Sequence, residues 1–187
     1  AAKMLKIDTE EKIAYYYYPS EKRYQQIIGV RKGHERALWK KKEFHTTSTF
    51  EDHEMVHLLI SHLGFPPFGL AEGAVFHVLG SWEGGRDIHM MVKEELWGKR
   101  LPPLFQMISQ TDMGTIGMSR SVPAWASFSM WLIDRYGIDK FLKLYVATDG
   151  IEAAGPFNAH FKEIYGKDFD VMDRDWRLWV LRYEPKK

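Results

Sequence analysis

The stretch HEMVHLLISHLG, residues 53–64, shows best how this chain folds. Its apolar residues recur at the spacing i, i+3, i+4 and i+7, namely Val56, Leu59, Ile60 and Leu63. That spacing predicts a helix with one apolar face, and Gly64 is typical of the residue at which such a helix ends. We therefore expect a helix that runs from about Glu51 and packs its apolar face against the rest of the protein.

The same helix carries the pattern His-Glu-x-x-His at residues 53–57. Residues four apart on a helix differ by about 40° around its axis, so the imidazoles of His53 and His57 project side by side. Glu54 lies about 100° from His53, which is too far round to ligate the same ion easily but suits a general base. Two imidazoles with one carboxylate and a water make an open tetrahedral zinc site. The pattern therefore predicts a catalytic Zn²⁺ bound by His53 and His57, with Glu54 beside it.

A third zinc ligand is offered by Glu72, which lies in the sequence LAEGA, residues 70–74, 15 residues after His57. The pair Pro66-Pro67 predicts a rigid turn that lays the helix of Glu72 against the first helix. A carboxylate surrounded by apolar residues needs a partner when it is buried, and a metal ion is a strong one. The alternative is a glutamate at the start of a helix, where the helix dipole stabilises its charge.

The pattern changes along the chain from strands to helices. Before residue 50, Ile13–Tyr18 and Ala37–His45 are the best strand candidates, and the many charges of Arg31–Lys42 favour an exposed edge strand. After it, apolar stripes and caps predict helices over residues 70–79, 87–97, 121–137 and 139–147, and further stripes over 157–165 and 172–183. We expect an α+β fold in a single domain over residues 1–187, with a small N-terminal sheet (1–50) followed by a mainly helical part (51–187).

Composition excludes several classes of protein. Of the 187 residues 45% are hydrophobic, which is enough to build a sizeable core. The 26 basic and 25 acidic residues nearly cancel, so no overall field attracts nucleic acid, and we expect no nucleic-acid partner. The absence of cysteine excludes disulfides, a thiolate metal site and a cysteine nucleophile. No run of 18 apolar residues occurs and no leader is visible, so we expect neither a membrane span nor a signal peptide in this chain.

Two motifs in this order, His53-Glu54-x-x-His57 and then Glu72-Gly73, are similar to those of the gluzincins, the peptidase MA-like zinc metallopeptidases. Further similarities follow in the family's order. Ser127-Phe128 with LIDRYG, residues 132–137, resembles the family's SF…L…YG helix. FKEIYG, residues 161–166, with Asp175-Trp176 resembles its F…YG…W ending. The similarity spans about residues 13–183.

The resemblance implies a zincin-like fold in which an N-terminal edge strand, here residues 37–47, lines the cleft. It implies His53, His57 and Glu72 as zinc ligands and Glu54 as the general base of a metallopeptidase. Zinc lowers the pKa of a bound water and polarises the scissile carbonyl, while the base takes the water's proton. The implied substrate is a peptide or protein that pairs with the edge strand, and the implied location is the cell envelope or the outside of the cell, as for a secreted hydrolase.

One departure from the family concerns the oxyanion. Gluzincins usually carry a tyrosine a few residues before the SF pair, whereas this chain has RSVPAW at residues 120–125. Electrostatic stabilisation of the oxyanion is often the largest catalytic contribution. Arg120 and His77 are the candidate replacements, and the alternative is that each has a structural or solvent-exposed role.

Two other interpretations remain open, of which the missing tyrosine favours the first. One is a catalytically weak or inactive peptidase-like domain that keeps the zinc scaffold and binds a peptide or protein. The other is a structural domain in which the His-Glu-x-x-His pattern occurs by coincidence.

Overall fold

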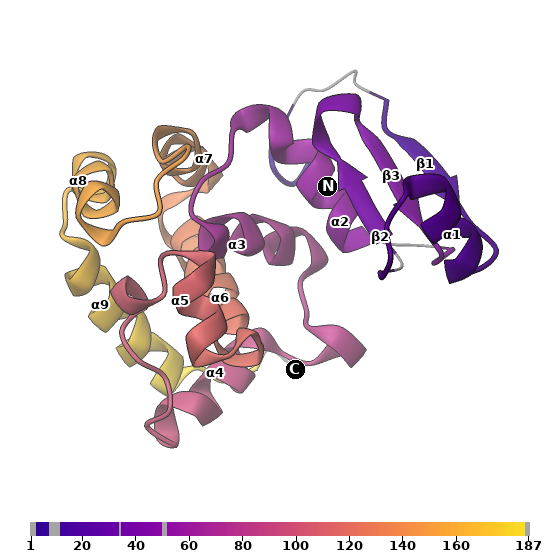
Figure 1. The fold of residues 1–187 in the computed structure, drawn as a ribbon. Coiled ribbons are helices and arrows are strands. Elements are labelled where there is room, and N and C mark those ends of the chain that lie inside the picture. The colour runs from indigo at the N-terminus through magenta and orange to yellow at the C-terminus, as the bar shows by residue number, and fades with distance from the viewer. Residues whose placement is uncertain (1–2, 8–11, 34, 50–51, 186–187) are drawn as a thin grey trace. The chain divides into compact units, whose positions relative to one another are not determined.

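The computed structural model describes residues 3–7, 12–33, 35–49 and 52–185. They form two compact units, Ala1–His62 and Leu63–Lys187, which are considered separately below (Figure 1). Within the described residues the chain forms three short strands in the first unit and mostly helices thereafter, nine α-helices in all, which confirms the α+β fold. The expected border between residues 50 and 51 lies outside the described residues, and the single domain over 1–187 stays a prediction.

The first unit is built on a mixed sheet of β1 (Ala14–Tyr17), β2 (Glu35–Leu38) and β3 (Glu43–Thr46), in the order β1-β3-β2. β3 pairs parallel with β1 and antiparallel with β2. Because β3 is central, its residues Phe44 and Thr46 are fully buried and form part of the core. The strand expected over Ile13–Tyr18 is confirmed in β1.

The single strand expected over Ala37–His45 is wrong, because the chain reverses in its middle. A 3-10 turn, η1 (Trp39–Lys41), follows β2, and Lys42 has a left-handed backbone with φ of 54°. The two halves then pair with each other, with Leu38 opposite Glu43. The charged edge expected over Arg31–Lys42 is therefore confined to β2, while the half that includes Phe44 becomes the buried centre of the sheet.

A helix that the sequence interpretation missed, α1 (Glu21–Ile28), connects β1 to the hairpin. The Ser20 hydroxyl caps its first turn by accepting the Arg23 backbone N–H at 3.3 Å. Gly29 ends the helix with φ of 75°, a left-handed conformation that glycine adopts without strain. Ser20 and Gly29 are the local signals that identify this helix.

The expected helix of residues 53–64 is present as α2 (Asp52–Ile60), which continues into a 3-10 turn, η2 (Ser61–Leu63), and packs on β3. Val56 and Ile60 are buried as expected, and so is Leu58. Leu63 is only half-buried, because a 3-10 turn has three residues per turn and rotates its side chains away from the α-helical stripe.

The second unit is helical and centres on the 19-residue helix α6 (Met118–Tyr136). The other helices are α3 (Phe68–Leu79), α4 (Ile88–Trp97), α5 (Gln110–Ile116), α7 (Ile138–Ala147), α8 (Ala154–Tyr165) and α9 (Phe169–Arg182). α3, α4, α5, α7 and α9 all contact α6, and α7, α8 and α9 follow one another along one side of the unit (Figure 1). None of the helices in the described part of the chain is both long and apolar enough to span a membrane.

The expected helices of this unit end within one residue of the sequence expectation, whereas α6, α8 and α9 each begin three residues earlier. Asp87 caps α4 by accepting the Met90 backbone N–H at 3.0 Å, as expected. α6, however, begins at Met118 and not at Ser121. The Ser121 hydroxyl does not cap a helix but donates to the Gly117 carbonyl at 3.0 Å from inside α6. The N-terminal cap signal that matters here is Ser109, which forms a capping box with Asp112 at the start of α5.

Aromatic side chains fill the core between α6, α8 and α9. Phe169 stacks on Trp125 at 5.7 Å and meets Phe157 at 5.0 Å, measured between ring centroids. Phe128 meets Trp176 edge-on at 5.6 Å. The buried indole of Trp125 donates to the Met107 carbonyl at 2.7 Å, so its polar group is satisfied. The apolar stripes expected on the last two helices therefore do form the core.

Two glycines, Gly69 and Gly73, let the backbone of α3 approach α6 closely. Any other residue at these two positions would add a Cβ that collides with α6. A Cβ at Gly73 would lie 2.0 Å from the Ser129 hydroxyl oxygen, and one at Gly69 would lie 2.3 Å from the Trp125 ring. The two glycines are four residues apart and so lie on the same face of α3. Because Gly73 is pressed against α6, the direction in which its neighbour Glu72 projects is fixed by this contact.

Replacement of Gly73 by alanine tests the contact. We expect Gly73→Ala to lower the free energy of unfolding by about 1–3 kcal/mol or more, because the new methyl group overpacks the contact with Ser129. Gly114→Ala is the matched control, since a Cβ at Gly114 in α5 meets nothing within 4 Å. It should leave stability unchanged or raise it by about 0.5–1 kcal/mol. Urea denaturation measures both, and equal stabilities for the two variants would contradict the packing argument.

Candidate metal centre

The two histidines of α2 lie side by side, as the sequence predicts. The ring centroids of His53 and His57 are 5.0 Å apart, with the rings nearly perpendicular, and both side chains are half-buried. The Trp39 ring meets His57 edge-on at 6.3 Å. One turn of helix thus presents two imidazoles to a common point, which is the arrangement that a shared metal ion needs.

Glu54 follows His53 directly and is half-buried near the start of α2. Its carboxylate makes no hydrogen bond or ion pair with any residue that the structure describes. It lies about 100° around the helix axis from His53, next to the histidine face but not on it. A carboxylate in that position can accept a proton from a water held between the two imidazoles.

The C-terminal end of α2 is held by Lys42 from the hairpin turn. The Lys42 ammonium donates to the Ser61 hydroxyl at 2.9 Å and to the Leu58 carbonyl at 3.4 Å. Ser61 in turn donates to the same Leu58 carbonyl at 2.8 Å. A cation at the end of a helix stabilises its terminal carbonyls. These bonds connect the helix that carries His57 to the sheet through the left-handed turn at Lys42.

Glu72 lies in the second unit, on α3, and only 5% of its surface is exposed. It is the fifth residue of the helix, and the first turn of α3 holds no acidic residue. The alternative of a glutamate stabilised at a helix start therefore loses its support, because the helix dipole acts within the first turn. Glu72 is a buried carboxylate among apolar residues, as the sequence predicts.

Tyr145 on α7 is a residue that the sequence interpretation missed. It is 2% exposed, and burial, reinforced by the negative charges of Glu72 and Asp149, raises the pKa of its hydroxyl well above the ordinary value. Tyrosine is protonated at neutral pH even without this shift, so the hydroxyl can donate a hydrogen bond. Tyr145 lies far from Glu72 in the sequence and shares no motif with it, so only the fold reveals the electrostatic coupling between them.

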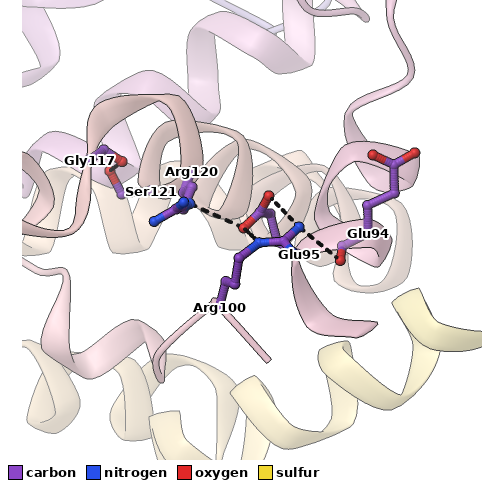
Figure 2. Close-up of polar contacts among 6 residues, drawn as sticks. All are labelled: Glu94, Glu95, Arg100, Gly117, Arg120 and Ser121. Atoms are coloured by element: carbon purple, nitrogen blue, oxygen red, sulfur yellow. Dashed lines mark hydrogen bonds and ion pairs between the residues drawn. The ribbon is translucent and has the colours of Figure 1, made fainter. Parts of the chain in front are cut away.

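Arg120, one of the two candidates for the oxyanion, is engaged elsewhere. Its guanidinium lies 3.2 Å from the Glu95 carboxylate, on an exposed part of α6 (Figure 2). Arg100 binds the same carboxylate with bonds of 2.9 and 3.0 Å, and these hydrogen bonds are the main reason why the pKa of Glu95 is lowered. Arg120 thus takes part in a surface ion-pair network that joins α4 to α6.

His77, the second candidate, lies on α3 and is half-buried. Burial lowers the pKa of His77 below its ordinary value, although the charge of Asp134 acts in the opposite direction. The ring is therefore neutral at pH 7 and offers no positive charge to an oxyanion. His77 also follows Glu72 by five residues, which places it about 140° around the helix from that carboxylate.

His53 and His57 on α2 offer two imidazole nitrogens, and Glu72 on α3 offers a carboxylate oxygen; both donor types can bind a metal ion. Catalytic zinc sites commonly use this donor set and leave a fourth position for water. Comparison of the chain with protein-family models, with curated proteins and with solved structures finds no match. A function for this site therefore has to be inferred from the residues and their surroundings.

The contact between Lys42 and α2 generates a test. We expect Lys42→Ala to lower the free energy of unfolding by about 1 kcal/mol, because it removes two hydrogen bonds and the cation at the helix end. Lys41→Ala removes an equal charge from the neighbouring exposed position and should change stability by less than about 0.5 kcal/mol. Chemical denaturation of the two variants measures the difference, and an equal loss in both would refute a specific role for Lys42.

Proposed function

We propose that this protein is a zinc-dependent peptidase in which His53, His57 and Glu72 bind the metal and Glu54 is the general base. The observation that carries the proposal is the pair of imidazoles held 5.0 Å apart on α2, with a carboxylate beside them that is not used in an ion pair within the described part of the chain. The buried Glu72 supports it, because a buried carboxylate is stabilised by a metal ion.

The connection between the two helices supports a shared ion. α2 with its 3-10 extension ends at Leu63, and α3 begins at Phe68, so only residues 64–67 join them. The five steps from Leu63 to Phe68 reach at most about 18 Å even when fully extended. Pro66 and Pro67 also restrict this segment, and the Phe65 N–H and carbonyl are bound by Asp149 and Gly150. A short, restrained connection is what a ligand set divided between two successive helices requires.

The proposed chemistry follows from these roles. Zinc, when bound, supplies a Lewis acid that polarises the scissile carbonyl and lowers the pKa of a water. Glu54 takes the proton of that water and passes it to the amine that leaves. An extended peptide substrate can add to the sheet at an edge strand, and β2 is the edge on the hairpin side. We place this activity in the cell envelope or outside the cell, in line with the family that the motifs resemble.

A catalytically weak or inactive domain that binds a peptide or protein is the second candidate. This candidate is favoured because neither residue expected to stabilise the oxyanion is suited to that role. Arg120 pairs with Glu95, and burial favours the neutral form of His77. We propose Tyr145 in their place as a hydrogen-bond donor to the oxyanion, because its hydroxyl is coupled electrostatically to Glu72. The activity of the wild-type protein decides between the two candidates.

Metal content and thermal stability test the ligand set. We expect about one zinc per chain by elemental mass spectrometry, and a chelator should lower Tm by roughly 5–10 °C, because zinc at 100 times its Kd adds about 2.7 kcal/mol. His57→Ala should lose both the zinc and the response to the chelator.

His62→Ala is the matched control, since His62 lies on the same segment but is exposed and bonded to the Leu59 carbonyl. It should keep the zinc. Wild-type protein that holds no zinc and shows no thermal shift when zinc is added would instead support a coincidental motif.

Turnover of a diverse peptide library, followed by mass spectrometry, tests the general base. We expect Glu54→Gln to bind zinc as the wild type does but to lose activity by a factor of about 10²–10⁴, because it cannot accept the proton. In the same assay, Tyr145→Phe should lower kcat if this hydroxyl stabilises the oxyanion. Equal residual turnover in wild-type protein and Glu54→Gln would reject the enzyme and leave the binding domain.

A further inference from the structure

The second unit holds a cavity of about 390 Å³ where α4 begins and α9 ends. Its walls come from the loop after α3, the first residues of α4, the face of α6 at Met130 and Asp134, and the last turn of α9. The volume lies in the range of small-molecule sites and is far larger than one metal ion or one water needs. None of the residues proposed to bind zinc lines this cavity.

Three rings form one wall of the cavity. Trp179 and Tyr183 lie 5.3 Å apart, and the His89 ring lies 4.9 and 4.8 Å from them, all measured between centroids. His89 is 7% exposed and is fixed from behind, because its Nδ1 shares a hydrogen bond of 2.8 Å with the Ser127 hydroxyl. Ser127 also accepts the Trp176 indole N–H at 3.1 Å, so one hydroxyl fixes both rings.

The surroundings of His89 favour the uncharged form of its ring. Within the described part of the chain the ring makes no hydrogen bond other than that to Ser127. Burial lowers the pKa of His89, against the opposing charges of Asp87 and Asp134, so the ring is neutral at pH 7. The aromatic wall therefore presents no positive charge to a ligand.

The charges at the cavity are negative. Asp87 and Asp134 line it, and neither Lys nor Arg occurs among the described residues of its lining. The Asp87 carboxylate is oriented by the Met90 N–H and by the Tyr183 hydroxyl, which donates at 2.9 Å. The carboxylate of Asp134 makes no hydrogen bond or ion pair with any described residue. A ligand in this cavity thus meets two carboxylates and two large aromatic rings.

We propose that this cavity binds a small organic cation with an ammonium head group. Such a head group is attracted to the faces of Trp179 and Tyr183 and to the carboxylate of Asp134, and the volume accommodates a short organic chain attached to it. An anionic ligand is repelled by both carboxylates. A neutral apolar ligand gains no attraction from either carboxylate. The site does not depend on the zinc site, and each can be tested without the other.

Calorimetric titration with matched probes tests the proposal. Choline and n-butylammonium are the cations, and 3,3-dimethylbutan-1-ol is the neutral molecule of the same shape as choline. We expect at least one of the two cations to bind with millimolar affinity or better, and the alcohol to bind at least about tenfold more weakly than choline or not at all, because it lacks the charge. No binding of either cation at millimolar concentration would overturn the proposal, as would an alcohol that binds as tightly as the cations.

Two pairs of variants locate the binding. Trp179→Leu and Asp134→Asn should each weaken the binding of the cation by about tenfold. Trp97→Leu and Asp175→Asn are the controls, since Trp97 is exposed at the end of α4 and Asp175 forms a surface pair with Lys167, both outside the cavity lining. They should bind the cation as the wild type does. Thermal melts check that all four variants are folded, and unchanged affinity in folded Trp179→Leu and Asp134→Asn would place any binding elsewhere.

Discussion

The close contact between α3 and α6 is the constraint on which the second unit depends. α3 has glycine, which has no side chain, at positions 69 and 73, so its backbone can lie against Trp125 and Ser129. The position of α6 is fixed in turn by the aromatic core on its other sides, where Trp125 and Phe128 meet the rings of α8 and α9. Glu72 is therefore presented by a helix that has little freedom to rotate or slide.

The two proposed sites use different physical means to hold their groups in place. The histidine pair relies on the regular geometry of one helix, whose end is fastened by Lys42. The cavity relies on a chain of hydrogen bonds that starts at the buried Trp176 and runs through Ser127 to His89. In both places the supporting hydrogen bonds come from residues outside the proposed site, Lys42 for the histidine helix and Ser127 for His89. A precise site requires such support.

Local patterns in the sequence predicted much of this structure. The helices that carry His53, Glu72 and Asp87 follow from apolar spacing and from caps, because these signals act within one helix. The distance between two histidines on one helix is likewise a local property. The burial of Glu72 could be predicted from its apolar neighbours alone.

Features that depend on distant contacts were not predictable in this way. The hairpin reverses at Lys42 although lysine has no special preference for a left-handed backbone, and the reversal puts Phe44 into the core of the sheet. The pairing of Arg120 with Glu95 and the coupling of Tyr145 to Glu72 join residues on different helices. No spacing rule connects such residues, since their proximity is decided by how the helices pack.

The hydroxyl of Ser129 is buried against Gly73 and has no hydrogen-bond partner among the described residues. A buried hydroxyl without a hydrogen-bond partner normally lowers stability. Serine therefore suits position 129 because its side chain is small, and not because it is polar. The interface between α3 and α6 thus tolerates smaller side chains but not larger ones. Alanine at position 129 fits the same space, whereas a larger side chain at Gly69 or Gly73 would push the two helices apart.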